Sequence, residues 1–101
     1  MYVERTNYWA QPDKAQQVLA VRRRASQIRT DLGLPAGTIF VKAAGQVEGP
    51  DVQWECTFKT LEERTKDLQV RDSSSDFRQI REAMRAVNER FERHLVLRDT
   101  N

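Results

Sequence analysis

The stretch Asp51–Arg64, DVQWECTFKTLEER, carries the clearest structural signal in the chain. In an extended strand, successive side chains point to opposite faces. One face of this stretch is then entirely apolar or thiol and the other is polar: Val52, Trp54, Cys56 and Phe58 on the first, Gln53, Glu55, Thr57 and Lys59 on the second. The alternation predicts a strand over Val52–Lys59 whose apolar face packs under helices. Trp54 and Cys56 are therefore predicted to be core residues, and Cys56 to be unreactive.

A helix is predicted to begin directly after this strand. Thr60 and Glu63 have the Thr-x-x-Glu spacing of a capping box, in which the two side chains bind backbone N–H groups at the start of a helix, so the helix should begin near Leu61. A serine of the run at residues 73–75 is predicted to interrupt it and to cap a following helix. The apolar stripe of that following helix recurs at steps of three and four: Phe77, Ile80, Met84, Val87 and Phe91.

The rest of the chain adds one helix and three strands. Apolar residues at steps of three and four predict an amphipathic helix from about Pro12 to Leu32. Runs of β-branched and aromatic residues predict strands at Tyr2–Trp9, Thr38–Ala44 and His94–Arg98. Two glycines and a proline within residues 45–50 predict a hairpin connection between the middle strands.

The resulting order, β-α-β-β-α-β, is the ferredoxin-like arrangement, so residues 1–101 are predicted to form a single α+β domain. Its four-stranded antiparallel sheet would have helices on one face only. The strands nevertheless carry bulky groups on both faces, with Phe40 opposite Ile39 and Val96 opposite Leu95. We therefore expect a homodimer in which two sheets pair face to face, as in a dimeric α+β barrel.

Composition argues against several other classes of protein. Seventeen Lys and Arg residues and fifteen Asp and Glu residues give a net charge of only +2, whereas nucleic-acid binders concentrate a larger positive excess. No apolar run is long enough to cross a membrane, and the charged N-terminus does not have the pattern of a signal peptide. One cysteine and one histidine do not make a zinc site. We expect a cytoplasmic protein without nucleic acid, membrane, metal or cofactor as partner.

The N-terminal stretch Tyr2–Tyr8, YVERTNY, followed by Gln11–Lys14, QPDK, resembles the opening of NIPSNAP-like and antibiotic-biosynthesis-monooxygenase-like domains. Those domains often have a short strand that ends in an aromatic residue, then Pro-Gly-Lys at the helix start, where this chain has Asp13 in place of the glycine. The likeness in sequence is confined to this stretch, whereas that in element order covers nearly the whole chain. The resemblance implies a dimeric α+β barrel whose ligand lies between sheet and helices or inside the barrel.

The same resemblance implies a range of activities that includes cofactor-independent oxygenases, isomerases and haem-degrading enzymes. Some haem-degrading members have an asparagine on the first strand, near the position of Asn7. Their ligating histidine belongs to the later helix, whereas His94, the only histidine here, is predicted on the last strand. This difference argues against haem, which needs an axial ligand.

Candidate catalytic residues are Asn7, Glu55 and His94, and candidate ligand-binding residues are Arg5, Trp9 and Lys42. Glu55 points away from the Trp54 face, toward the side that a dimer would enclose, where burial can shift a carboxyl pKa. The imidazole of His94 has an ordinary pKa near neutrality. A Glu55–Lys42 ion pair across the hairpin is expected.

The first strand presents aromatic and hydrogen-bonding side chains on both faces, and the pattern does not say which face the helices cover. Such a mixture suits a small-molecule pocket and equally an ordinary interface. The arginine run at residues 22–24 lies between Val21 and Ala25 of the apolar stripe, so it is expected mainly on the solvent side of its helix.

Two functions fit these features. The first is a small-molecule-binding barrel, whose enzymatic form would be a cofactor-independent oxygenase or isomerase. The alternative is a non-enzymatic ligand-sensing or assembly module, in which Phe40, Val96 and the aromatic side chains fill the inner face. RNA binding through the sheet is disfavoured, because the third strand has no closely spaced aromatic pair of the RNP1 type.

Overall fold

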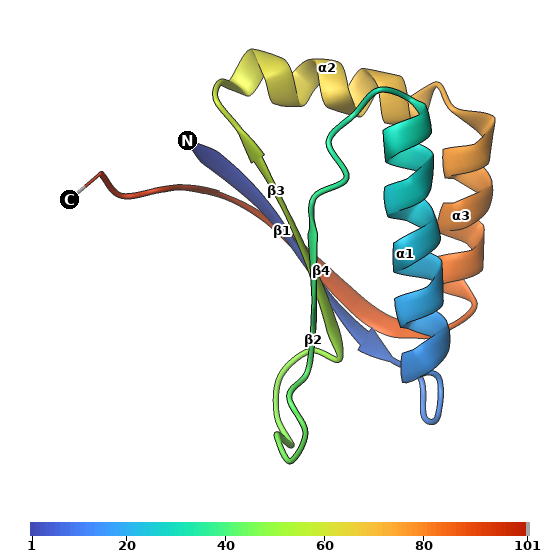
Figure 1. Cartoon of the computed structure of the whole chain (residues 1–101). Coiled ribbons are helices and arrows are strands. Elements are labelled where there is room, and N and C mark those ends of the chain that lie inside the picture. Colours follow the sequence, from blue (N-terminus) through green and yellow to red (C-terminus); the bar gives the residue numbers. More distant parts are fainter. Residues whose placement is uncertain (101) are drawn as a thin grey trace.

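A computed structural model describes residues 1–100 as a four-stranded antiparallel sheet with three helices on one face (Figure 1). The elements follow in the order β1 (Tyr2–Ala10), α1 (Ala15–Asp31), β2 (Thr38–Val41), β3 (Val52–Phe58), α2 (Leu61–Asp72), α3 (Ser75–Arg85) and β4 (Asn88–Leu97). The strand order in the sheet is β2-β3-β1-β4. The predicted α+β, ferredoxin-like arrangement is confirmed, with the second helix divided into α2 and α3 at the serine run.

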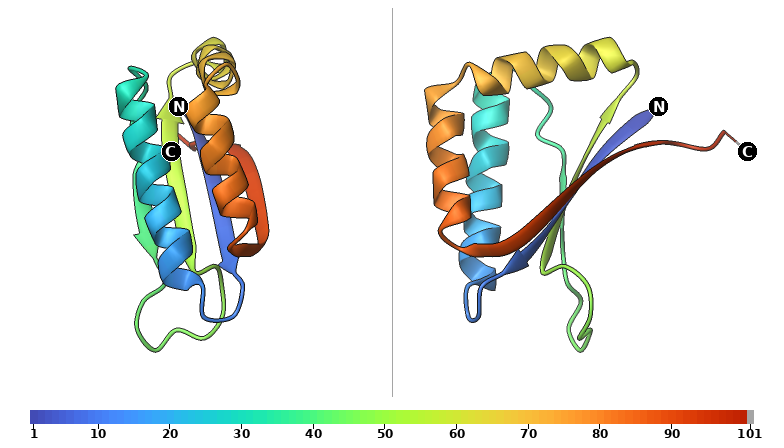
Figure 2. Two further views of the ribbon diagram at one scale, coloured as in Figure 1. Left: turned by 90° about the vertical axis from the view of Figure 1, so that its right-hand side faces the viewer. Right: turned by 180° about the vertical axis from the view of Figure 1, so that it is seen from behind.

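The helices α1 and α3 lie side by side over the sheet, and α2 crosses one end of the layer (Figure 2). Both caps predicted after β3 are present. The Thr60 hydroxyl accepts a hydrogen bond from the Glu63 N–H at 3.1 Å, and the Ser74 hydroxyl accepts one from the Phe77 N–H at 3.1 Å. The Glu63 carboxylate accepts in turn from the Lys59 N–H at 2.9 Å. These contacts fix where α2 and α3 begin.

Helix α1 begins at Ala15 rather than Pro12, because Asp13 has a positive φ of 64°. This left-handed conformation favours glycine and is tolerated by aspartate. Thr38–Val41 is also a shorter strand than the predicted Thr38–Ala44.

The last strand is longer than predicted, since β4 begins at Asn88 and pairs with β1 along nearly its whole length. Phe91 therefore lies on β4 and not on the preceding helix, which ends at Arg85. The prediction was wrong here because Val87 and Phe91 continue the helical spacing of α3, while Phe91 also fits the alternation of a strand.

The apolar face of β3 packs under the helices as predicted, with Val52, Trp54, Cys56 and Phe58 all buried. On β1, the side chains of Tyr2, Glu4, Thr6 and Tyr8 share this covered face, as the strand register shows. The structure thus shows which face of β1 the helices cover, a point that the residue pattern did not decide. Val3, Arg5, Asn7 and Trp9 lie on the opposite face, which we call the open face because no helix covers it (Figure 2).

The open face carries exposed apolar groups, as predicted. Phe40 is 45% exposed and Val96 is 37% exposed. No helix within residues 1–100 is both long enough and apolar enough to span a membrane. The cytoplasmic location stays a prediction.

Candidate ligand-binding site

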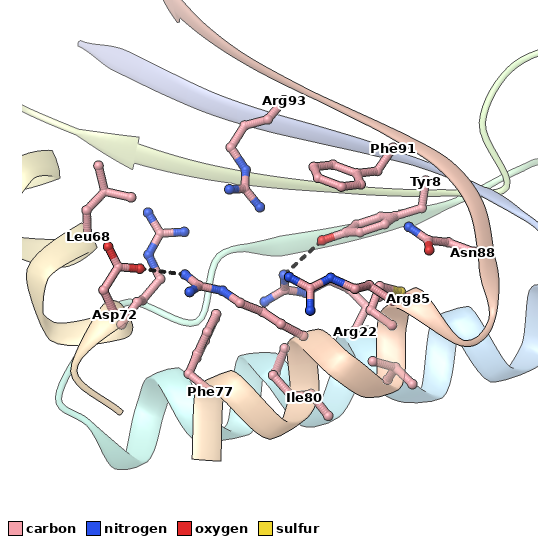
Figure 3. A pocket seen from close by; sticks show the side chains of 15 residues that line it. Tyr8, Arg22, Leu68, Asp72, Phe77, Ile80, Arg85, Asn88, Phe91 and Arg93 are labelled. Carbon is pink, nitrogen blue, oxygen red and sulfur yellow. Dashed lines mark hydrogen bonds and ion pairs between the residues drawn. The ribbon is translucent and has the colours of Figure 1, made fainter. Parts of the chain in front are cut away.

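A cavity of about 440 Å³ lies between the sheet and the helices α1 and α3 (Figure 3). It separates two apolar clusters, one formed where α1 covers the sheet and one formed between α1 and α3. Its volume is within the usual range for small-molecule pockets. Five arginines line it: Arg22, Arg71, Arg81, Arg85 and Arg93. Asp72 is the one lining carboxylate in the part of the chain that the structure describes.

Arg22 is the most unusual of these residues. Its side chain is 5% exposed, yet no carboxylate among residues 1–100 pairs with it. Nη1 donates to the Tyr8 hydroxyl at 3.2 Å and Nη2 donates to the Ser26 hydroxyl at 3.4 Å, while Nε has no hydrogen-bond partner. The guanidinium lies 4.5 Å from the centre of the Trp54 ring. Burial lowers the pKa of Arg22, but an arginine remains charged at neutral pH.

The sequence-based expectation for this residue was wrong. Arg23 and Arg24 are exposed as predicted, but Arg22 faces the sheet. The buried positions of α1 include Val18, Arg22, Ala25 and Arg29, which follow one another at steps of four, three and four. That spacing was readable in the sequence, and it places two arginines on the covered side of the helix.

The other buried charges near the cavity belong to a paired network around Glu4, which is fully buried. Arg71 contacts both of its carboxylate oxygens at 3.2 Å, Arg64 donates to it at 3.0 Å, and Arg93 lies 3.8 Å away. Burial alone would raise the pKa of Glu4, but the charges and hydrogen bonds of Arg71 and its neighbours outweigh this and lower the pKa below its ordinary value.

Asp67 extends this network toward α1. Arg29 binds it through both terminal nitrogens, at 3.0 and 2.7 Å, and Arg71 Nε lies 2.8 Å from it. Arg81 pairs with Asp72 at 2.8 Å, and Arg85 pairs with Glu82 on the surface. Of the five arginines around the cavity, Arg22 is thus the one with no carboxylate partner in the described chain.

Trp54 and Cys56 are core residues, as predicted. Trp54 is 1% exposed, and the guanidinium groups of Arg22 and Arg29 lie 4.5 and 4.8 Å from the centre of its ring. Burial raises the pKa of the Cys56 thiol, although the charge of Arg29, whose Nη2 is 3.6 Å away, acts in the opposite direction. A buried thiol with a raised pKa is a poor nucleophile.

The candidate residues taken from the sequence lie elsewhere, on the open face. Arg5 stands across from Glu55 on β3 and from His94 on β4, and its Nε is 2.6 Å from the Glu55 carboxylate.

The other candidate residues of the open face also have partners. Asn7 accepts a hydrogen bond from Gln53 at 2.9 Å. Trp9 lies under the guanidinium of Arg90 at 3.8 Å, and His94 is 3.5 Å from Glu92. Alternation along the first strand correctly put Arg5, Asn7 and Trp9 on one face of it. The register of the sheet then puts them on the same face as Glu55 and His94, and the sheet separates that face from the cavity.

The expected Glu55–Lys42 pair does not form. The register places Thr38 across from Glu55, and Lys42 lies beyond the end of β2. Lys42 instead contacts Asp51 at 3.3 Å, while Glu55 contacts Arg5. The register of β2 against β3 depends on the connection between them, so the residue pattern alone did not determine it. Within residues 1–100, no group of three or more His, Cys, Asp or Glu side chains is arranged to hold a metal ion.

No protein-family model matches the sequence, and no curated protein matches it. Solved structures do match. A NIPSNAP domain protein from Burkholderia xenovorans superposes with a TM-score of 0.77 at 12% identity, covering 99% of this chain and 96% of that chain. This chain has the fold of NIPSNAP domain proteins. The fold implied by the N-terminal resemblance is therefore confirmed.

Two further solved structures are similar. A NIPSNAP family protein from Agrobacterium tumefaciens has a TM-score of 0.74 at 20% identity, covering 98% of this chain and 86% of that chain. A protein from Bacteroides fragilis, described as dimeric, of unknown function and with a ferredoxin-like fold, has a TM-score of 0.69 at 8% identity, covering 94% and 93%. At these identities the likeness is one of fold.

Proposed function

We propose that this protein binds a small organic anion in the cavity between its sheet and helices. The observation that carries the proposal is Arg22, a buried guanidinium that lines the cavity and has no carboxylate partner within residues 1–100. Leaving a charge buried without a counter-charge costs several kcal/mol. An anion in the cavity would supply the missing charge, so ligand binding offsets a cost already present in the folded protein.

The hydrogen-bonding capacity around Arg22 supports the same proposal. Each terminal nitrogen of a guanidinium carries two hydrogens, and each of those of Arg22 uses one in a long contact to a hydroxyl. The Tyr8 hydroxyl accepts from Arg22, which leaves its own proton to be donated to a ligand. Three guanidinium hydrogens, one on each nitrogen, and one hydroxyl hydrogen therefore have no partner within residues 1–100.

Homodimerisation is part of the proposal. The open face exposes Phe40 and Val96, and Trp9 is half-buried there under Arg90. A second copy of the chain would cover these groups by pairing sheet to sheet. The structurally similar protein from Bacteroides fragilis is described as dimeric. In such a dimer the cavity would remain on the outer, helix-covered side of each sheet.

The dimer would also enclose the row formed by Arg5, Glu55 and His94, and this row is the second candidate site. An enzymatic form of the protein, a cofactor-independent oxygenase or isomerase, would use Glu55 and His94 as acid and base groups there, beside Asn7. Incubation of the dimer with candidate organic anions, followed by mass spectrometry, tests for turnover at this second site. Glu55→Gln and His94→Gln should each abolish it and leave ligand binding in the cavity unchanged. Turnover that both variants retain would exclude these roles.

Thermal unfolding with a panel of organic anions tests the binding proposal. The panel contains monocarboxylates, dicarboxylates, sulfonates and phosphate monoesters. A ligand present at ten times its Kd stabilises the folded state by about 1.4 kcal/mol, which raises Tm by roughly 6–11 °C in a domain of this size. At least one class should do so for the wild type and for Arg24→Met, but not for Arg22→Met. A panel that leaves the wild-type Tm unchanged, or a shift that Arg22→Met retains, would contradict the proposal.

A further inference from the structure

We infer that the anion is a monocarboxylate with an apolar body about the size of one ring. This inference rests on the proposed function and narrows it to one chemical class. Three properties of the cavity support it: Arg22 is the lining arginine that lacks a carboxylate within residues 1–100, its guanidinium presents a planar pair of donors, and apolar side chains form the facing walls.

The charge of the ligand follows from the ion pairs around the cavity. Four of the lining arginines have a carboxylate within ion-pair distance: Arg71 and Arg93 share Glu4, Arg81 has Asp72 and Arg85 has Glu82. Only Arg22 lacks one in the described part of the chain. One anionic head group would therefore give Arg22 the partner that it lacks, whereas the second charge of a dicarboxylate or a phosphate monoester would find no further lining arginine without a carboxylate.

The head group of the ligand follows from the geometry of Arg22. Its planar fork presents one unused hydrogen on each terminal nitrogen, and two parallel hydrogen bonds of this kind match the two oxygens of a carboxylate. The Tyr8 hydroxyl, 3.2 Å from Nη1, donates a third hydrogen bond to the same group. The guanidinium is held in place by its stacking on Trp54 and by burial, so little side-chain entropy is lost on binding.

The body of the ligand follows from the apolar walls. Phe77 and Ile80 project from α3, and Phe91 and Tyr8 face them from the sheet (Figure 3). Met84 of α3 also lines the cavity. Phe91 stands across from Tyr8 on the covered side of the sheet, yet it is 51% exposed because the cavity separates it from α3. Its ring centre lies 6.5 Å from that of Tyr8. An apolar ring in the cavity would cover Phe91, whereas acetate has no ring and would leave these apolar side chains in contact with water.

Isothermal titration calorimetry with five probes tests the inference: benzoate, cyclohexanecarboxylate, acetate, benzyl alcohol and phenyl phosphate. We expect benzoate and cyclohexanecarboxylate to bind. Acetate lacks the ring, benzyl alcohol lacks the charge and phenyl phosphate adds an unmatched charge, so each of these three should bind at least about tenfold more weakly. Arg22→Met should weaken benzoate binding about tenfold or more, and Phe91→Ala should weaken benzoate but not acetate. Arg24→Met should change neither affinity.

The location of the bound carboxylate has its own readout. In a Trp9→Phe variant, Trp54 is the only tryptophan, and it stacks on Arg22. Cyclohexanecarboxylate, which does not absorb where tryptophan does, should change Trp54 emission with the same midpoint as the calorimetric titration. Circular dichroism checks that every variant is folded.

The outcomes separate this inference from the proposed function. Arg22-dependent binding of phenyl phosphate in preference to benzoate would overturn the monocarboxylate class and leave the anion site standing. Equal binding of benzyl alcohol and benzoate would overturn the need for charge, and with it both claims. Binding of no organic anion would also overturn both. Cyclohexanecarboxylate binding that survives in Arg22→Met and leaves Trp54 emission unchanged would place the ligand elsewhere and overturn both claims.

Discussion

Substitution of Glu4 by glutamine is expected to be among the most damaging single changes in the sheet. Glu4 is fully buried, and three arginines converge on it. Removing one partner from a buried ion pair costs about 3–5 kcal/mol because the remaining charge is left without compensation. Arg71 keeps Asp67, and Arg64 and Arg93 are partly exposed to water, so the lower end of this range, about 3 kcal/mol, applies.

Urea denaturation at one fixed protein concentration measures this loss. With a slope of about 1.5 kcal/mol per M urea, the midpoint should fall by about 2 M. The control is Glu82→Gln, the same substitution in a surface pair with Arg85, which should change stability by less than about 0.5 kcal/mol. A Glu4→Gln variant whose midpoint matched that of the control would show that the network around Glu4 does not hold the helices to the sheet, and the reasoning would be refuted.

The pH dependence of the same variant follows from the lowered pKa of Glu4. A carboxyl whose pKa is lower in the folded than in the unfolded protein binds fewer protons when folded, so its stabilising contribution is present above the ordinary pKa of 4.5 and is lost as the pH falls. The stability difference between wild type and Glu4→Gln should therefore shrink between about pH 6 and pH 3. A difference that stayed constant across this range would contradict the assignment of a lowered pKa.

Three further predictions concern the dimer, the cysteine and a helix cap. Val96→Glu should convert the dimer to a monomer in analytical ultracentrifugation, whereas Val47→Glu, on an exposed loop, should not; a wild type that sediments as a monomer at micromolar concentration would exclude the dimer. Cys56 should react with a thiol reagent only as fast as the protein unfolds, and rapid reaction in the folded state would contradict its burial. Thr60→Ala should cost about 1 kcal/mol of stability by removing the cap of α2, and Thr65→Ala, farther along the same helix, much less; equal losses would show that the cap is unimportant.

Much of the fold could be predicted because its signals are local. The alternation around Trp54 identifies both the strand and its buried face, and the spacing of Thr60 and Glu63 identifies the start of α2. The boundary between α3 and β4 could not be predicted, because Phe91 satisfies the period of the helix and that of the strand. Phe91 belongs to β4 because it pairs with Tyr8 of the central strand β1, and this contact joins residues far apart in the sequence.

The candidate site was harder to predict than the fold. Alternation fixes which residues share a face within each strand, but only the register of the sheet brings Arg5, Glu55 and His94 together, and only the structure shows that the cavity lies on the other face. Arg22 looked like part of a solvated run because charged residues are rarely buried without a partner. Its place four residues after Val18 on the buried stripe is a usable signal, but the absence of a carboxylate near it is a property of the tertiary structure.

The most direct test of the anion site is the NMR resonance of the Arg22 Nε–H, followed during a titration with benzoate and assigned by comparison with Arg22→Lys. This N–H is buried and has no hydrogen-bond partner in the described structure, so a carboxylate bound to the same guanidinium should shift its signal saturably, with the calorimetric affinity. The Nε–H of Arg29, which already binds the Pro35 carbonyl at 2.7 Å, should move much less. An Arg22 resonance that stays in place while benzoate binds would contradict the account.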